Sequence, residues 1–432
     1  MTVLSSMNSG VSGLKAESDA LGVVGDNIAN VNTSGFKAQR AVFEDVLGHS
    51  ILAGTSTGLP GSGVRIGDIQ QMFTQGTLSN TGVSTDIALN GDGFFTVKGT
   101  VDGVSSNFYT RAGEFVIDKD GKLSNTAGLK VQGYQANGDG TFAASISDVT
   151  APTAALPARA TQAVSVTANI DSAAKVPTLA FDPLDPANTS NFSTTMSIYD
   201  SLGSAHTMDV YFVKTADNAW DYHAMVPGAD LNPPVAGSSE VGTGALTFTT
   251  DGALDTVTTG TAITASFGGG ATAAQPITIS FGTAIAAGGT GLDGTTQFAG
   301  PSNVSAQKQD GYSSGDFAGV SVDGQGVVTG LYTNGEKVAM SQLAIAKFRS
   351  NDGLGRAGQN LWISTRESGT AAMGTAGSGG RGATSGGALE GSNVDLASEF
   401  VSMIQHQRSF AANSKTITTA DEMLQELINL KR

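Results

Sequence analysis

The first forty residues, MTVLSSMNSGVSGLKAESDALGVVGDNIANVNTSGFKAQR (1–40), decide how this chain is organised. Apolar residues recur there at intervals of seven, with a second row of mostly small residues three positions earlier. This pattern is typical of a helix that buries one stripe against a partner. We expect a helix from about residue 4 to about residue 30, ended by residues 32–35, where Gly35 tolerates a left-handed backbone. The side chains expected to carry the packing are Leu4, Met7, Val11, Leu14, Leu21 and Ile28.

The other end of the chain repeats the pattern. Apolar residues again recur at intervals of seven from residue 396 to residue 424, so we expect a second long helix. Ser392 is its predicted N-cap, with Asp395 three positions later to complement it. The packing positions are Leu396, Phe400, Met403, Phe410, Ile417 and Leu424.

The N-terminal helix is weak by itself. It contains Gly10, Gly13, Gly22 and Gly25, and each interior glycine costs roughly 1 kcal/mol relative to alanine. Isolated helices of this length are marginal even with good helix formers. We therefore expect the segment to be largely unfolded until a partner covers it. That partner is either the other end of the same chain or a helix of a neighbouring copy. Because one pair of helices leaves its flanks bare, we favour neighbouring copies.

The middle of the chain is β in character from about residue 71. Asn-Gly and Asp-Gly pairs recur and mark hairpin turns. Alternating apolar residues precede or follow them, as at 208–212, 220–224 and 277–281. Trp220 and Trp362 are the expected core anchors. The predicted fold is mainly β with α-helical termini, in which the terminal helices form a coiled-coil-like inner domain and nested discontinuous β domains lie outside.

Composition shifts divide the chain into four parts. Proline-bearing stretches at 150–162 and 301–315 mark two boundaries, and glycine-rich stretches at 54–63 and 366–391 mark flexible segments. The predicted parts are terminal helices (1–35 with 385–432), a linker region (36–70 with 366–384), a discontinuous β domain (71–145 with 302–365) and an inserted outer β domain (146–301). Within the linker region we expect a short helix that contains Val42, Phe43 and Leu47.

The charge balance excludes nucleic acid as a partner. The chain has 23 Lys and Arg and 38 Asp and Glu, a net charge of −15, whereas phosphate binding needs a basic surface. Residues 146–300 hold 3 basic and 13 acidic residues (3 − 13 = −10), which suggests an outward, solvated surface. There is no cysteine and no apolar run of 18 residues, so we expect neither disulfides nor membrane insertion. No cleavable secretory signal is evident at the N-terminus.

Motifs for chemistry are absent or weak. Residues 377–382 match G-x-G-x-x-G, but more glycine and serine follow instead of a helix, so a linker is the better interpretation. His49, His206, His223 and His406 share no metal-ligand spacing. We predict no catalytic, cofactor-binding or metal-binding residue, no cofactor and no enzymatic activity.

Two terminal stretches carry a resemblance to a known family. Residues 12–39 (SGLKAESDALGVVGDNIANVNTSGFKAQ) and 387–432 (GALEGSNVDLASEFVSMIQHQRSFAANSKTITTADEMLQELINLKR) resemble the terminal signatures of the bacterial flagellar rod and hook basal-body proteins. The stretches DIALNGDGFFTVKG (86–99), YTRAGEFVIDKDGKL (109–123), IYDSLGSAHTMDVYFVKTADNAW (198–220) and AGQNLWIST (357–365) resemble the hook members of that family.

The resemblance implies a function, partners and a location. It implies a structural subunit that polymerises with itself into the flagellar hook, a flexible curved tube that acts as a universal joint between rod and filament and transmits motor torque. The implied partners are the distal rod protein, the hook cap, the hook–filament junction proteins and the type III export apparatus, with an extracellular location and no cleaved signal peptide. Phe43 and Leu47 resemble a short export-gate motif. A helical turn with two buried apolar residues explains the same pattern equally well.

Two alternatives remain at this stage. A flagellar distal rod subunit shares both terminal signatures, but rod proteins of this kind generally lack an insertion such as 160–300. A secreted β-rich adhesin or binding module would use the acidic insertion as its binding face, and ligand binding by that insertion would favour it.

Overall fold

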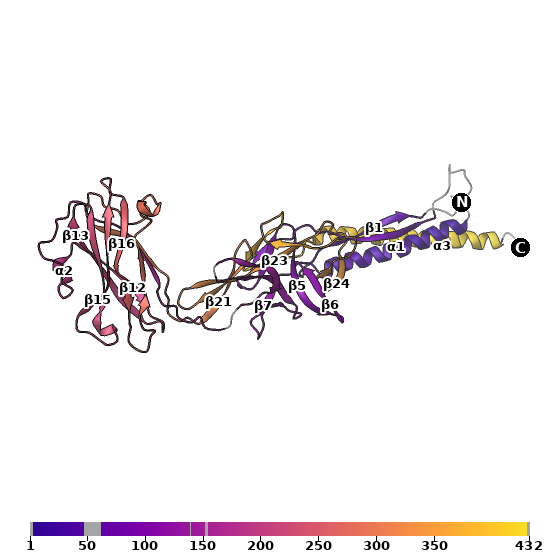
Figure 1. The fold of residues 1–432 in the computed structure, drawn as a ribbon. Helices are drawn as coiled ribbons and strands as arrows, with labels where there is room; N and C mark the ends of the chain where they lie inside the picture. The colour runs from indigo at the N-terminus through magenta and orange to yellow at the C-terminus, as the bar shows by residue number, and fades with distance from the viewer. Residues whose placement is uncertain (1–2, 47–61, 139, 152–153, 430–432) are drawn as a thin grey trace. The chain divides into compact units, whose positions relative to one another are not determined.

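The computed structural model describes residues 3–46, 62–138, 140–151 and 154–429 (Figure 1). The chain divides into two compact units. Unit 1 comprises residues 1–153, 319–331 and 337–432, and unit 2 comprises residues 154–318 and 332–336. Unit 1 is therefore made of three separate stretches of sequence, whereas unit 2 is almost one continuous stretch.

Two long helices belong to unit 1. Helix α1 (Val3–Ala29) is followed by Gly35 in the left-handed conformation (φ 68°), so the predicted stop is confirmed. Helix α3 (Leu396–Asn429) begins one turn later than we expected. Its N-cap is Asp395, whose carboxylate accepts the backbone N–H groups of Ala397 (2.8 Å) and Ser398 (3.1 Å). The predicted cap at Ser392 is wrong because residues 391–395 are not helical and the helix starts at Leu396.

The segment after α1 is a β ribbon and not the short helix that we predicted. Strands β1 (Gln39–Asp45) and β2 (Val64–Gln71) pair antiparallel, with a register shift at Val42/Phe43. The β-branched and aromatic residues of this segment favour a strand once a partner strand is available. Both strands contact α1. Residues 47–61, and with them Leu47 and most of the predicted loop 54–63, lie outside the described residues.

The main sheet of unit 1 is assembled from both halves of the sequence. Its path runs β21-β22-β23-β9-β5-β6-β25-β24, with β7, β8, β10 and β26 paired off this path. The strands are β5 (Phe94–Val101), β6 (Val104–Thr110), β7 (Phe115–Ile117), β8 (Leu123–Asn125), β9 (Lys130–Ala136), β10 (Phe142–Asp148), β21 (Phe317–Val322), β22 (Val327–Tyr332), β23 (Lys337–Lys347), β24 (Gly355–Gly358), β25 (Leu361–Ile363) and β26 (Ala372–Thr375).

Residues 366–391, which we expected to be a flexible segment, contain three strands. Strand β26 pairs with β23, and two further antiparallel pairs follow along the chain. The G-x-G-x-x-G stretch forms the tight turn after β26, with Gly377, Gly379 and Gly380 at positive φ. The glycines thus make turns between ordered strands and not a flexible connection. The two pairs are β4 (Ile87–Asn90) with β27 (Ala383–Gly386) and β3 (Leu78–Asn80) with β28 (Ala388–Glu390).

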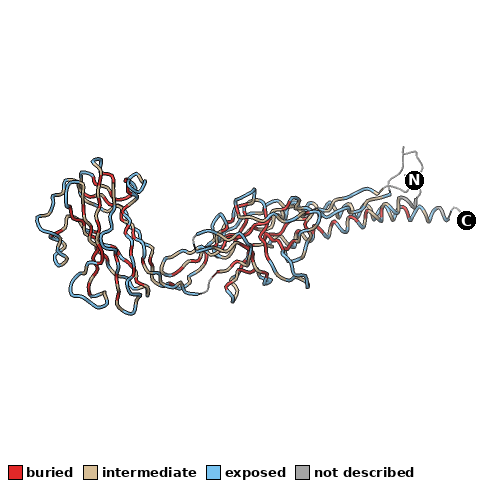
Figure 2. The backbone as a smooth tube through the Cα atoms, in the orientation of Figure 1, coloured by how far each residue is buried: buried red, intermediate tan, exposed pale blue. Residues whose placement is uncertain are grey.

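Unit 2 buries one apolar core between two sheets. A five-stranded antiparallel sheet keeps the order of the chain, and in a second sheet β11 pairs parallel with β19 and antiparallel with β20. Trp220, Phe212 and Phe281 are fully buried in the shared core. Figure 2 shows buried residues in red along the strands of unit 2. The strands are β11 (Ala163–Asn169), β12 (Phe192–Tyr199), β13 (Ala205–Ala216), β14 (Ala219–Pro227), β15 (Ser238–Phe248), β16 (Leu254–Thr261), β17 (Thr264–Ala265), β18 (Gln275–Pro276), β19 (Thr278–Ser280) and β20 (Asn303–Gln309), with short helices at α2 (Pro186–Thr189), η2 (Gly228–Asp230) and η3 (Ile285–Ala287).

The predicted fold class, mainly β with helical termini, is confirmed. The alternating residues 208–212 and 220–224 lie on β13 and β14 with their apolar members inside. Trp362 is buried in the core of unit 1 beside Phe94 and Tyr109, and Trp220 is buried in unit 2. The coiled-coil packing and the four domain boundaries remain predictions.

Candidate assembly interface

Helices α1 and α3 lie side by side and run antiparallel (Figure 1). A Cβ atom added at Gly10 would meet Ile417 at 3.0 Å, and the Asn27 amide donates to Glu399 (3.1 Å) near the other end of the pair. The buried face of α1 is formed mainly by small side chains, and the two helices therefore approach closely. It consists of Gly10, Gly13, Ala16, Ala20, Val23 and Val24. The chain therefore covers one face of α1 with its own α3, which is the first of the two partners considered above.

The pair nevertheless leaves an apolar surface bare. On α3, Phe400, Val401 and Ile404 expose 50%, 57% and 50% of their surfaces. Leu396 is also exposed. Leu396, Phe400 and Ile404 are spaced four apart and therefore lie along one side of the helix. We call Leu396, Phe400, Val401 and Ile404 the α3 apolar row. A contiguous exposed apolar patch of this kind marks an interaction surface.

The predicted packing residues divide between these two environments. On α1, Met7, Leu14, Leu21 and Ile28 are half-buried and Val11 is exposed, while the side chain of Leu4 lies outside the description. On α3, Met403, Ile417 and Leu424 are half-buried, and Leu396, Phe400 and Phe410 are exposed. The seven-residue stripes thus run along the flanks of the α1–α3 contact, so their role in self-assembly remains a prediction.

An ion pair and a ring contact join three elements near the middle of the helix pair. His406 Nδ1 lies 2.6 Å from Glu17 Oε2, and the His406 ring stacks on Phe43 of β1 with 6.1 Å between centroids. Phe43 is therefore placed on a strand against α3. The proposed export motif stays a prediction, because its second residue, Leu47, is outside the described residues.

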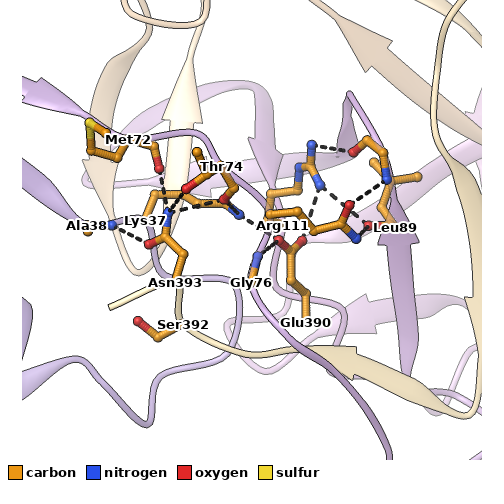
Figure 3. Close-up of polar contacts among 12 residues, drawn as sticks. Lys37, Ala38, Met72, Thr74, Gly76, Leu89, Arg111, Glu390, Ser392 and Asn393 are labelled. Carbon is orange, nitrogen blue, oxygen red and sulfur yellow. Dashed lines mark hydrogen bonds and ion pairs between the residues drawn. The ribbon is translucent and has the colours of Figure 1, made fainter. Parts of the chain in front are cut away.

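A buried charge cluster joins the segment after α1 and the segment before α3 to the β strands of unit 1 (Figure 3). Glu390, at the end of β28, receives Lys37 Nζ at 2.6 Å and Arg111 Nη1 at 3.2 Å, together with the backbone N–H of Gly76 at 2.9 Å. The three charged side chains are 0%, 1% and 5% exposed for Glu390, Lys37 and Arg111. Lys37 follows α1 and Glu390 precedes α3, so one carboxylate joins the two ends of the chain. We call these three residues the junction cluster.

Asn393 extends the anchor toward α3. Its amide donates to Met72 O (2.7 Å) and Thr74 Oγ1 (2.8 Å), and its carbonyl accepts the backbone N–H of Ala38 (2.7 Å) (Figure 3). Thr74 O also accepts Lys37 Nζ at 2.8 Å. These bonds hold residues 37–38, 72–76 and 390–393 as one polar layer beneath the helix pair.

Burial shifts the pKa values of both cations in the junction cluster. It lowers the pKa of Lys37 from the usual 10.5, and the carboxylate of Glu390 opposes that shift. Burial likewise lowers the pKa of Arg111, again opposed by Glu390. The carboxylate is thus the counter-charge that both buried cations share. Removing one partner of such a pair typically costs about 3–5 kcal/mol, because an unpaired charge remains inside.

The sequence alone does not reveal the junction cluster, although each of its residues lies in a stretch that carries the family resemblance. Lys37 lies in SGFKAQ, Arg111 in TRAGEF and Glu390 in GALEGSN. The available signal was a charged residue inside a short stretch that also contains glycine and alanine. Nothing in the sequence alone connects residues 37, 111 and 390, because the connection depends on the sheet pairing.

No chemical site emerges in the part of the chain that the structure describes. No group of three His, Cys, Asp or Glu residues could hold a metal ion there. His206 lies between Asp230 (3.1 Å) and Asp200 (3.4 Å), and His223 pairs with Glu240 (2.5 Å). Each of these contacts ties neighbouring segments of unit 2. None of the described helices is long and apolar enough to cross a membrane.

Curated relatives match this chain from end to end. It is 37% identical to the flagellar hook protein FlgE of Salmonella typhimurium over 99% of this chain and 100% of that protein. The chain belongs to the flagellar hook protein FlgE family. The hook protein FlgE of Escherichia coli K12 is 36% identical over 98% of each chain, and that of Treponema pallidum is 34% identical over the full length of both.

Four family models match successive parts of this FlgE family member. They match the flagella basal body rod protein (7–37), the flagellar hook protein FlgE/F/G D1 domain (88–171), the flagellar basal body protein FlaE D2 domain (169–312) and the flagellar basal body rod FlgEFG protein C-terminal region (385–430). A crystal structure of Helicobacter pylori flagellar hook protein FlgE2 has a similar fold, with a TM-score of 0.50, 14% identity, and coverage of 71% of this chain and 98% of that one. These full-length matches favour neither the rod nor the adhesin alternative.

Proposed function

We propose that this chain is the repeating subunit of a flagellar hook. The observation that carries the proposal is the α3 apolar row, which the molecule's own α1 leaves exposed beside a well-anchored helix pair. Burying a large apolar side chain contributes about 1.5–3 kcal/mol. Four such residues on one helix thus supply a strong contact when a neighbouring copy covers them.

The contact between copies is heterologous, because an α3 row that meets a different surface of the next copy leaves that copy's own row free for another. Such contacts build open helical polymers when the rotation does not close. At 1.5 Å per residue, the 27 residues of α1 and the 34 residues of α3 span about 40 Å and about 50 Å. Helices of this length reach past one subunit, so several copies share each helix surface in an inner tube.

The β units then form the outer part of a flexible tube that transmits motor torque as a universal joint. Because residues 372–390 contain the paired strands β26, β27 and β28, we do not place the flexibility there. The division of the chain into units 1 and 2 offers another place for this flexibility. We place the four predicted domains in this scheme with the terminal helices innermost and the insertion outermost.

The same proposal fixes partners and location. The subunit meets the distal rod protein at one end of the tube and the hook cap or junction proteins at the other. It leaves the cell through the type III export apparatus and has no enzymatic activity. Its acidic middle faces solvent, in accord with the net charge of −10 in residues 146–300.

The direct experiment removes the gene for this chain from the bacterium that encodes it. We expect loss of swimming and, by electron microscopy of isolated basal bodies, rods that end without a hook. Restoring the gene returns curved tubes. A rod that is also missing would point to the rod subunit, and intact hooks in the deletion strain would contradict the proposal.

A further inference from the structure

Unit 1 cannot complete its core from the first half of the chain. Its early strands pair among themselves, as β5 does with β6 and β9. However, β5, β6 and β9 also pair with β23 or β25, which come more than two hundred residues later. Phe94 and Tyr109 are buried against Phe348 and Trp362. Strands β4 and β3 pair with β27 and β28, close to the end of the chain. The five-stranded sheet of unit 2, by contrast, pairs each strand with the next one in sequence.

The last of the late strands also brings the counter-ion. Within residues 1–151, as far as the structure describes them, the Lys37 ammonium has Thr74 O as its acceptor and the Arg111 guanidinium has Leu89 O (3.5 Å) and Gly91 O (2.8 Å). Asp92 also favours the charge on Arg111, but its side chain is 71% exposed and lies beside Lys347. The charges of Lys37 and Arg111 oppose each other.

We infer that Glu390 is a closing latch, whose arrival allows the two buried cations to be enclosed and so makes the folding of unit 1 wait for the C-terminal segment. Before residue 390 is present, closing the strands would bury two cations without a carboxylate. Once β28 pairs with β3, one side chain neutralises one of the two charges and accepts bonds from both. This inference concerns the order of folding and does not rest on assembly into a hook.

The latch has a consequence for chains that emerge from their N-terminus. Unit 2 folds as soon as its own stretch is out, while unit 1 stays open until just before α3. The helix pair is then seated on a closed unit 1, because Glu390 is only six residues ahead of the first residue of α3. A chain that lacks its last fifty residues would keep an open unit 1 and would present no seated α1.

Pulsed hydrogen exchange during refolding of the full chain tests the latch. We expect amides of β13 and β14 to become protected first, and amides of β4 and β5 to become protected together with those of β28. Glu390→Gln keeps the size and acceptor oxygen but removes the charge. It should lower the equilibrium protection of β4 and β5 roughly 100- to 1,000-fold and leave β13 and β14 unchanged. Protection of β4 and β5 before β28 would overturn the inference, as would a Glu390→Gln chain with wild-type protection.

A second variant separates charge from shape. Lys37→Met with Glu390→Gln restores the original net charge of the cluster, +1, by removing one cation. Because Arg111 is then a single buried cation without a carboxylate, we expect β4 and β5 protection to recover by at least about tenfold relative to Glu390→Gln alone and to stay below wild type. Glu367→Gln, on an exposed residue after β25, is the matched control and should change nothing. A double variant as open as Glu390→Gln alone would show that packing and not charge controls closure, and would overturn the latch.

Discussion

Units 1 and 2 bury their interiors by different means. Unit 2 is formed almost entirely by one continuous stretch, and its centre is apolar, with Trp220, Phe212 and Phe281 fully buried. Unit 1 joins three stretches, and a buried carboxylate of the third stretch pairs with two cations of the first. An apolar core forms wherever enough apolar area is gathered, whereas an ion cluster needs all of its partners at once. Unit 1 is thus the part whose integrity depends on both ends of the chain.

The helix pair shows the same contrast on its surface. The face between α1 and α3 is closed by small residues, and the opposite side of α3 stays apolar and exposed. A molecule made to stay alone would place polar residues there. The next four predictions test these differences.

The largest effect is expected on the α3 apolar row. Phe400→Asp with Ile404→Asp should raise the critical concentration for polymerisation at least about 100-fold, because two charges replace buried apolar contacts. Leu184→Asp, on a leucine of unit 2 that is 81% exposed, is the control and should polymerise normally. Sedimentation and electron microscopy measure both. Normal tubes from the double variant would place the contact elsewhere.

Trp220→Ala should destabilise unit 2 and leave unit 1 folded. Trp220 is fully buried, and loss of such a side chain typically costs about 3–5 kcal/mol. Denaturant unfolding followed by hydrogen exchange should show loss of protection in β13–β15 and none in β5 or β23. If protection falls equally in both units, they do not unfold independently, and the contrast drawn above fails.

The glycines of α1 should respond in opposite ways according to their environment. A Cβ at Gly22 meets nothing within 4 Å, so Gly22→Ala should stabilise α1 by up to about 1 kcal/mol. At Gly13 a Cβ would lie 2.6 Å from Asn413, so Gly13→Leu should loosen the pair. Amide exchange in α1 of the monomer reports both changes. Equal responses at the two positions would argue against the observed face of α1.

Acidification should weaken unit 2 through Asp310. Burial alone would raise the pKa of Asp310, but N–H groups of Ala163 and Gln162 and the Arg159 guanidinium outweigh it and lower that pKa from the usual 3.8. The unfolded chain then binds the proton first, so this stability is present above about pH 4 and is lost as pH falls through the folded-state pKa.

Asp310→Asn should reduce the slope of the unfolding free energy against pH, by the equivalent of less than one bound proton. Asp251→Asn, on an exposed turn, is the control and should leave that slope unchanged. The test is the free energy of unfolding of unit 2, measured between about pH 2 and about pH 6, the range in which aspartates titrate. An unchanged slope in Asp310→Asn would contradict the assignment.

The sequence predicts best where one local period suffices. Both helices and the alternating strands of unit 2 follow from spacing, because each buries one face against whatever lies nearest. Segment 366–391 is harder to predict, because glycine is common both in flexible linkers and in tight turns. Its pairing with β23, β4 and β3 is what shows that its glycines form turns between strands. The seven-residue stripes indicated apolar helices. They did not reveal that Gly10 and Gly13 would form the contact, because close approach depends on the neighbour.

The central claim is that copies of this chain cover the α3 apolar row of one another. Since the chain has no cysteine, Val401→Cys creates a single labelling site on that row. Maleimide labelling of this variant as monomer and as polymer is the most direct measurement. The account predicts rapid labelling of the monomer and at least about tenfold slower labelling of the polymer, by the area removed from solvent. Equal labelling rates in the two states would contradict it.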